Sequence, residues 1–473
     1  MRGLLASSVG VTCAAALALP LTSPAVAARP VSPAAVRPAS GAEALGGTQS
    51  LPLAPLTSRD RTLAPVAEQG LPRRDVRHFS LVGVIWDDPD TVLHGSVQVR
   101  TRAAGTDTWS GWQDLETHND DAADPGTAER TSGRVHGATA PLWVGDSDGV
   151  EVRVRAEADR RTEDTARGSR TATTTATLPT GLRLELVDPG ESAPAPTRRE
   201  SPAGTPHRAL APRSAPTAEP ADDLAGTDAA AANDGLVGLD ATEIPALDRQ
   251  QTEDELFALR AGQLTDRQRA KPYIGPRPRI VTRRGWGADE NLRERGFVYT
   301  KKVKAAFVHH TASGNGYRCT QAPSLIRGIY RYHVKSMGWR DIGYNFLVDK
   351  CGNIYEGRAG GVAKPVLGAH TLGFNSQSMG IAVLGSYGSK KPPAAVTKAV
   401  ARLAAWKLGL HGANPKGKTY LKSGGGNLYP KGRKVRLNVI SGHRDGFATE
   451  CPGRQLYRKL ASTRTTAARL QGR

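Results

Sequence analysis

The chain has 473 residues, which is long enough for two or three domains, and its formal net charge is +19. The charge is unevenly distributed: residues 273–473 carry 36 Lys and Arg against 8 Asp and Glu, a net charge of +28, so residues 1–272 together carry about −9. Beyond the N-terminal segment, no run reaches the 18 or so apolar residues that a membrane-spanning helix needs, which excludes an integral membrane protein.

The N-terminal residues have the pattern of a secretory signal peptide. Arg2 is followed by an apolar stretch over 4–21 and then by small residues up to Ala28, where a signal peptidase would cut. We therefore expect residues 1–28 to be removed, together with Cys13. The mature protein is expected to be secreted and either extracellular or associated with the cell wall.

Two segments are rich in Pro, Ala and Ser and show little apolar periodicity. Residues 29–75 are predicted to be a flexible spacer. Residues 189–272 are predicted to be a disordered interdomain linker with one helix around 253–264.

Between these segments, residues 76–188 contain short runs that alternate between apolar and polar residues. Alternation with a period of two, broken by turn-forming Asp and Gly, favours an antiparallel β-sandwich as an accessory domain. The runs are S-L-V-G-V-I-W at 80–86, S-V-Q-V-R-T-R at 96–102 and V-E-V-R-V-R-A at 150–156.

From residue 273 to 473, apolar runs typical of strands alternate with helical patterns. This mixture predicts an α/β domain with a central mixed sheet flanked by helices. Strands are expected at 303–309 and 379–384, a hairpin at 342–348 and 353–355, and helices at 322–335 and 394–408.

Three residues in this domain form a candidate metal site. His309 lies in V-H-H-T-A-S at 308–313, and His443 and Cys451 lie in G-H-R-D-G-F-A-T-E-C-P-G at 442–453. Two imidazoles and one thiolate suit zinc and leave its fourth position for water, as in catalytic sites. Taken singly, residues of these kinds are more often scattered loop positions than metal ligands. A structural zinc site would need a fourth protein ligand, and the sequence does not reveal one.

Three cysteines remain once the signal peptide is removed. Cys319 and Cys351 fit a disulfide in an oxidising compartment, with Cys451 kept as a metal thiolate. Pairing Cys451 with either of the other two is the alternative, and it would destroy the zinc site.

Further motifs lie between the two metal segments in a distinctive order. With them, residues 278–460 closely resemble the family of peptidoglycan recognition proteins and type-2 N-acetylmuramoyl-L-alanine amidases, which includes phage T7 lysozyme, and a secreted bacterial member is expected. The motifs are I-V-T-R-R-G-W-G-A at 280–288, R-G-I-Y-R-Y-H at 327–333, G-W-R-D-I-G-Y-N-F-L-V-D at 338–349, G-N-I-Y-E-G-R at 352–358 and G-A-H-T-L-G-F-N-S-Q-S-M-G-I-A-V-L-G at 368–385.

The resemblance implies a role for each candidate residue. One Zn²⁺ per chain would lie at the floor of an open groove, and the first histidine of the H-H pair, rather than His310, would be a ligand. Tyr344 would position water and stabilise the oxyanion. Thr449, which stands where T7 lysozyme has a lysine, would be the second catalytic group, although a threonine is a weaker candidate for proton transfer. The implied metal ligands are His309, His443 and Cys451, the implied groove residues are His370 and Asn375, and the implied disulfide is Cys319–Cys351.

The function implied by this resemblance is hydrolysis of the amide between the lactyl group of muramic acid and L-alanine in peptidoglycan. A recognition protein that binds peptidoglycan without cleaving it is the alternative, but such relatives typically replace the cysteine that is present here as Cys451. The basic charge, part of it in a Gly-rich insertion at 412–436, suits anionic wall polymers. Nucleic acid is not expected as a partner, and the protein is expected to be a monomer.

Overall fold

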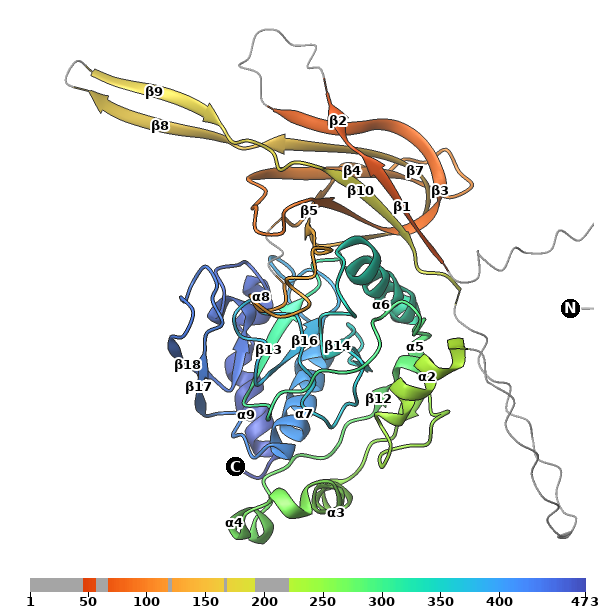
Figure 1. The fold of residues 1–473 in the computed structure, drawn as a ribbon, viewed down its shortest axis with the longest axis vertical. Helices are drawn as coiled ribbons and strands as arrows, with labels where there is room; N and C mark the ends of the chain where they lie inside the picture. The colour runs from red at the N-terminus through yellow and green to blue at the C-terminus, as the bar shows by residue number, and fades with distance from the viewer. Residues whose placement is uncertain (1–45, 57–66, 118–120, 166–167, 192–220) are drawn as a thin grey trace, which may run out of the picture. The chain divides into compact units, whose positions relative to one another are not determined.

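The computed structural model of the chain describes residues 46–56, 67–117, 121–165, 168–191 and 221–473 (Figure 1). The predicted signal peptide lies outside these residues. The described part contains an N-terminal β domain and a C-terminal α/β domain.

The N-terminal domain is antiparallel and encloses one hydrophobic core. Its main sheet has the order β1-β10-β3-β7-β4-β5, and β2 and β6 both pair with β3. Because β3 and β7 are long and their pairing carries register shifts, the sheet bends around its buried side chains (Figure 1). The prediction of an all-β, sandwich-like domain is confirmed. The strands are β1 (Gly47–Pro52), β2 (Ala54–Pro55), β3 (Glu68–Trp86), β4 (Gly95–Ala103), β5 (Gln113–Leu115), β6 (Gly137–Ala138), β7 (Leu142–Ala156) and β10 (Arg183–Asp188), with a separate hairpin of β8 (Ala158–Thr165) and β9 (Gly168–Thr175).

The spacer predicted over 29–75 is wrong for its described residues, most of which are strands of this domain. β1 pairs with β10 along its whole length, and β2 pairs with β3. β1 is paired on one side alone and none of its side chains is fully buried, so it lacks the apolar alternation by which a strand is recognised in a sequence.

The linker predicted over 189–272 is also wrong from Ala221 onward. Here the chain forms α2 (Ala221–Ala231), β11 (Glu243–Ile244), α3 (Arg249–Arg260) and α4 (Asp266–Ala270). Asp248 and Gln251 form a capping box at the start of α3, and Ile244 and Leu256 are buried in the core of the α/β domain. Two well-placed apolar side chains thus attach a segment whose overall composition resembles a linker. The predicted helix at 253–264 corresponds to α3, and residues 192–220 lie outside the described part.

The α/β domain has a mixed seven-stranded sheet in the order β11-β12-β15-β14-β16-β13-β19. Its two faces bury different residues: α7 and α9 pack with Val308 and Ile381 on one face, and α6 packs with Ala382 and Leu384 on the other. This confirms the predicted fold. The elements are β12 (Ile280–Val281), α5 (Arg283–Trp286), β13 (Ala305–His310), α6 (Ala322–Arg331), β14 (Phe346–Val348), β15 (Ile354–Glu356), β16 (Ser378–Val383), α7 (Ala394–Leu410), β19 (Ile440–Gly442), α8 (Arg454–Tyr457) and α9 (Leu460–Leu470).

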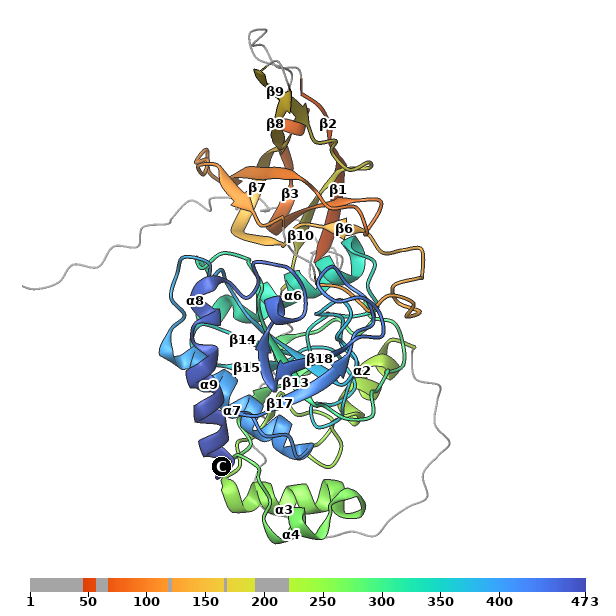
Figure 2. The same ribbon diagram turned by 90° about the vertical axis from the view of Figure 1, so that its left-hand side faces the viewer.

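The basic Gly-rich insertion contains a hairpin of β17 (Lys418–Lys422) and β18 (Lys434–Asn438) (Figure 2). Leu421, Val435 and Leu437 of this hairpin pack on Phe307 and Phe374. Its basic side chains are exposed, namely Lys416, Lys418, Lys422, Lys431, Arg433, Lys434 and Arg436. The insertion is therefore a folded ribbon with a basic outer surface.

The two domains share one hydrophobic cluster in addition to the core of each domain. Leu81 and Ile85 of β3 belong to the same buried cluster as Ile329 of α6 and Tyr332, which follows α6. The Tyr332 hydroxyl donates a hydrogen bond to the backbone oxygen of Thr139, at 3.2 Å. A buried contact of this kind fixes segments of the N-terminal domain against the α/β domain.

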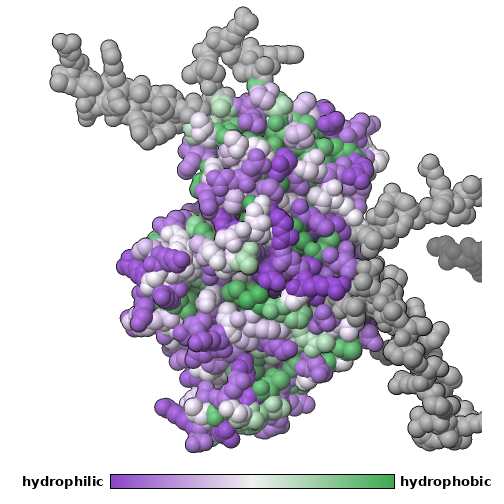
Figure 3. Space-filling view, viewed as in Figure 1, coloured by the Kyte–Doolittle hydropathy of each residue, from purple (hydrophilic) through white to green (hydrophobic). Residues whose placement is uncertain are grey.

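The outer surface is mainly hydrophilic on the face drawn in Figure 3. Hydrophilic residues cover most of that face, and hydrophobic ones form small groups (Figure 3). Within the described part of the chain, no helix is long and apolar enough to cross a membrane.

A disulfide joins Cys319 to Cys351, as predicted, and Cys451 is buried and takes no part in a disulfide among the described residues. The bond closes a loop with a sequence separation of 32.

Replacing both cysteines by alanine should lower the free energy of unfolding by about 3–4 kcal/mol, because the unfolded chain regains the entropy of that loop. Urea unfolding of the wild-type and the variant measures the difference. Equal stability would show that the bond contributes nothing to the fold.

Candidate metal centre

Parallel strand pairing brings the two histidines together. β13 pairs in parallel with β19, with Val308 opposite Gly442, so both strands end at the same edge of the sheet. His309 lies at the end of β13 and His443 follows β19 directly. Their ring centroids are 4.5 Å apart and both side chains are fully buried.

The chain after His443 turns back and places Cys451 beside the two rings. The Cys451 Sγ lies 3.7 Å from His309 Nδ1, and the His310 backbone N–H points at this sulfur from 3.4 Å. Ligand atoms of His309, His443 and Cys451 all lie within 4.8 Å of one another. The three residues predicted from the sequence therefore meet at one point.

The protonation states suit a metal. Burial lowers the pKa of His309 to about 3 and, with the neighbouring His309, that of His443 to about 3, so both rings are neutral at pH 7. Thr371 Oγ1 lies 3.4 Å from His309 Nε2 and can accept its proton, which leaves Nδ1 free to bind a metal. Among the described residues, neither ring nitrogen of His443 has a hydrogen-bond partner. Buried lone pairs without a proton donor fit a zinc ion.

A fourth candidate ligand comes from the N-terminal domain, and the sequence analysis missed it. Asp121 Oδ1 lies 2.9 Å from His309 Nδ1 and 3.4 Å from His443 Nδ1. The Asp121 side chain is almost fully buried, and this burial raises its pKa to about 6, while His443 and Tyr344 oppose the shift. Asp121 therefore lies against the two imidazoles, beside the group that His309, His443 and Cys451 form.

Tyr344 lies in the turn before β14, with its hydroxyl at the candidate centre. The hydroxyl donates a hydrogen bond to Asp121 Oδ2 at 2.6 Å, and its ring is 5.6 Å from that of His309. Burial, followed by the Asp121 charge, raises its pKa well above the usual value, so the hydroxyl keeps its proton. Thr449 has a different setting: its Oγ1 accepts a hydrogen bond from the Cys451 backbone N–H at 3.2 Å. Thr449 therefore orients the loop that carries the thiolate.

The two residues expected to line a groove lie in the segment before β16, and both are fully buried. The His370 ring packs edge-on against His309, with centroids 5.2 Å apart. Gly380 makes room for it, since a Cβ there would lie 2.4 Å from His370 Cγ. Asn375 Oδ1 accepts hydrogen bonds from the backbone N–H groups of His370 and Thr371, and its Nδ2 donates to the Ala122 backbone oxygen.

Two other histidines have structural partners, as expected of residues outside the ligand set. His310 Nδ1 accepts a hydrogen bond from the Tyr387 backbone N–H at 3.1 Å. His333 Nδ1 accepts one from the Gly343 backbone N–H at 3.2 Å, which fixes the turn that carries Tyr344. The role of His333 was not recognised in the sequence, where its helical position indicates packing alone.

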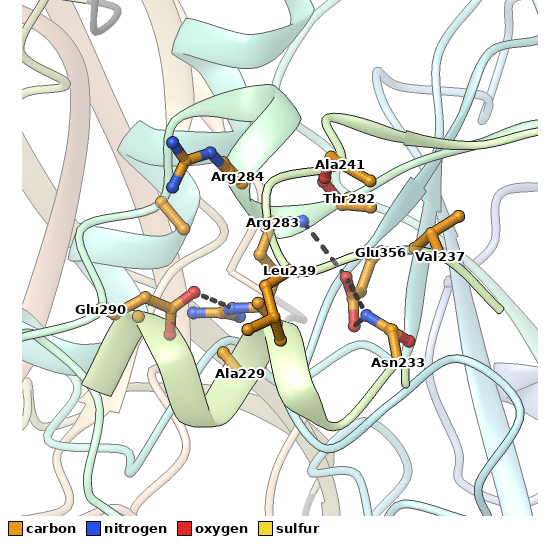
Figure 4. Close-up of a pocket in the computed structure, with 14 residues that line it drawn as sticks. Ala229, Asn233, Val237, Leu239, Ala241, Thr282, Arg283, Arg284, Glu290 and Glu356 are labelled. Atoms are coloured by element: carbon orange, nitrogen blue, oxygen red, sulfur yellow. Dashed lines mark hydrogen bonds and ion pairs between the residues drawn. The ribbon is translucent and has the colours of Figure 1, made fainter. Parts of the chain in front are cut away.

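A separate pocket of about 120 Å³ lies between α2 and α5 (Figure 4). Glu356 is a buried acidic residue in the lining of this pocket, and burial raises the pKa of its carboxyl group to about 7. The Glu356 carboxylate accepts hydrogen bonds from Asn233 Nδ2 at 2.9 Å and from the Arg283 backbone N–H at 3.2 Å (Figure 4). Since these polar groups satisfy one another, the arrangement attaches α2 to the domain and does not resemble a reactive site.

Comparisons with known proteins agree with both parts of the fold. A family model described as N-acetylmuramoyl-L-alanine amidase matches residues 299–454. Another, described as Rv3811 N-terminal galactose-binding domain-like, matches residues 34–177, so the N-terminal domain is galactose-binding-like.

Individual relatives match the α/β domain. Peptidoglycan-recognition protein SC2 of Drosophila simulans is 34% identical over 183 residues, which cover 38% of this chain and 84% of that protein. Peptidoglycan-recognition protein 1 of Holotrichia diomphalia is 30% identical over 186 residues, covering 39% of this chain and 79% of that protein. Among solved structures, peptidoglycan recognition protein-LE in complex with tracheal cytotoxin has 30% identity and a TM-score of 0.30, and the match covers 39% of this chain and 92% of that one. The chain therefore belongs to the family of peptidoglycan-recognition proteins and type-2 amidases.

Proposed function

We propose that this protein is a secreted, zinc-dependent N-acetylmuramoyl-L-alanine amidase that cleaves the amide between the muramic acid lactyl group and L-alanine of peptidoglycan. The observation that carries the proposal is the convergence of His309, His443 and Cys451, with ligand atoms within 4.8 Å of one another. A bound zinc ion would polarise the amide carbonyl and lower the pKa of a water molecule. Export to the cell wall rests on the apolar N-terminal segment.

We assign to Tyr344 the role of binding the oxygen of the reacting amide. Its hydroxyl keeps its proton and donates a 2.6 Å hydrogen bond to Asp121 Oδ2, and the other oxygen of this carboxylate faces the two histidines. A substrate oxygen in the same place would accept the same hydrogen bond, which becomes stronger as negative charge develops on that oxygen. Thr449, through the Cys451 backbone N–H, holds the thiolate in position.

A recognition protein that binds peptidoglycan without cleaving it is the second candidate. Asp121 favours it, because its carboxylate lies against two of the three candidate ligands, and a fourth protein ligand would make the zinc site a structural one. Retention of Cys451 and Tyr344 favours the amidase. The basic outer surface of the 412–436 insertion suits anionic wall polymers in either case.

Cleavage separates the two candidates directly. The wild-type chain and an Asp121→Ala variant are incubated with muropeptides, with a chelator or with added zinc, and mass spectrometry detects free stem peptides. We expect stem peptides that begin with L-alanine, released in a zinc-dependent manner by at least one of the two proteins. Their absence from both would exclude the amidase.

The metal content tests the ligand set. Purified protein should contain about one zinc per chain, and Cys451→Ser should lose most of it together with any cleavage, because zinc prefers the thiolate to a hydroxyl. Elemental analysis measures the metal. His411→Gln is the control, because His411 lies beside Arg260 and outside the ligand set. Undiminished cleavage by metal-free protein would contradict the zinc-dependent function.

Tyr344→Phe should keep zinc and lower the turnover number by about 10²-fold or more, because the donor to the oxyanion is removed. The comparison is made in the Asp121→Ala background, so that the hydrogen bond between Tyr344 and Asp121 does not contribute. Tyr355→Phe is the matched control, since this buried tyrosine donates to Asp349 instead, at 2.9 Å. Zinc content, melting temperature and turnover are measured on one sample. Unchanged turnover in a stable, zinc-loaded variant would remove Tyr344 from the reaction.

A further inference from the structure

One segment of the N-terminal domain, residues 121–130, lies in the candidate site of the α/β domain. It belongs to the connection between β5 and β6. Asp121, Asp124 and Glu129 are at most 9% exposed, although all three carry carboxylates. Carboxylates are rarely buried unless they are paired, so the partners of these three explain why the segment lies there.

The first carboxylate occupies the positions that catalysis needs. Asp121 Oδ1 faces the two histidines at 2.9 and 3.4 Å, and Oδ2 accepts the Tyr344 hydrogen bond at 2.6 Å. A metal held by the two histidines would have the Asp121 carboxylate beside it, and the Tyr344 hydroxyl is already engaged by Asp121. A water molecule or a substrate oxygen would have to displace Asp121 to reach either group.

The second carboxylate holds the segment against the chain before β16. Asp124 Oδ1 accepts hydrogen bonds from the Gly373 backbone N–H at 2.8 Å and from Asn375 Nδ2 at 2.8 Å. The same Nδ2 donates to the backbone oxygen of Ala122, also at 2.8 Å. Asn375, one of the residues predicted to line the groove, is thus engaged by the chain itself.

The third carboxylate forms a buried ion pair further along the segment. Glu129 and Arg358 make two parallel hydrogen bonds of 2.8 and 2.9 Å, and their side chains are 7% and 5% exposed. The Arg340 backbone N–H adds a third hydrogen bond to Glu129, at 3.2 Å.

Little room for a ligand remains beside the segment. The cavity that borders Asp121, Ala122, Leu372 and Phe447 measures about 130 Å³. Pockets for ligands of drug size usually measure about 300–1,000 Å³. A muropeptide is larger than such ligands, so it needs the space that the segment fills.

We propose that residues 121–130 are an autoinhibitory segment, with Asp121 as a displaceable fourth metal ligand, so that the chain is latent until the segment leaves the site. The inference rests on the proposed amidase function for its consequence and on the contacts above for the occlusion itself. Because the segment is part of the chain, it competes at a high effective concentration with any ligand that arrives from solution.

The occlusion is tested without catalysis. Zinc is replaced by Co²⁺ in the full chain, and acetohydroxamate, a small ligand that needs an open coordination position, is titrated while the visible absorption is followed. Asp121→Ala should keep the metal and bind acetohydroxamate roughly 10- to 10³-fold more tightly than the wild type, because the closed state no longer competes. Glu129→Gln, which leaves every group at the metal unchanged, should shift binding in the same direction.

Asp107→Asn is the matched control, because Asp107 is an exposed carboxylate in the same domain and outside the segment. It should bind acetohydroxamate as the wild type does. Equal binding by all four proteins would overturn the proposal. Loss of metal from Asp121→Ala, with Glu129→Gln unchanged from the wild type, would also overturn it and make Asp121 a permanent structural ligand.

The same proteins are then given muropeptides. Faster release of stem peptides by Asp121→Ala and Glu129→Gln than by the wild type supports both proposals. Tighter acetohydroxamate binding without cleavage by any variant supports the occlusion and contradicts the amidase function alone.

Discussion

The candidate site depends on the parallel pairing of β13 with β19. Two parallel neighbours end at the same edge of a sheet, so the residues that follow Val308 and Gly442 become adjacent although they are far apart in the sequence. Gly442 allows this arrangement because it has no side chain: a Cβ at this position would lie 2.7 Å from the Tyr457 ring. A shift of this pairing by one residue would turn His309 to the opposite face of the sheet.

Burial then determines the chemistry. His309, His370 and His443 are fully buried side by side, and burial lowers the pKa of each, so none carries a charge that would repel a cation. Thr371 lies within hydrogen-bond distance of His309 and His370, whereas neither nitrogen of His443 makes a hydrogen bond to any described residue, and the Asp121 carboxylate lies 3.4 Å from its Nδ1. This contrast indicates a metal site within a core whose neighbouring polar atoms have hydrogen-bond partners.

The sequence predicted those parts of the site that short motifs encode. His309, His443 and Cys451 follow apolar strands, and a thiolate beside two imidazoles has few other uses, so their convergence could be predicted. The disulfide was predicted because the family resemblance favoured it over the two alternatives. Asp121 could not be found in this way, because it is separated from its partner Tyr344 by 223 residues and lies in another domain. Periodicity describes which face of its own element a residue occupies, and an irregular segment such as 121–130 has no periodicity to read.

One property of the sequence, its uneven distribution of charge, is consistent with the contact between residues 121–130 and the α/β domain. Residues 273–473 carry a net charge of +28, and the preceding part about −9, so the two halves attract each other. We interpreted the basic charge as complementary to an external polyanion, yet the structure uses part of it internally, where Arg358 binds Glu129. The strand at 47–52 was missed for a different reason, since an edge strand needs no alternation to form its hydrogen bonds.

The buried ion pair also constrains what can displace the segment. The Arg358 side chain is 5% exposed while the segment is in place, and displacing Glu129 removes the carboxylate that pairs with its guanidinium. Removing one partner of a buried ion pair is costly. A ligand with an anionic group at that position would restore the lost interaction, whereas a neutral ligand of equal size would not. Coupling between two binding events is reciprocal. The contacts that hold the segment in the site would therefore also determine which ligands can displace the segment. The occluding segment would in this way contribute to specificity as well as to inhibition.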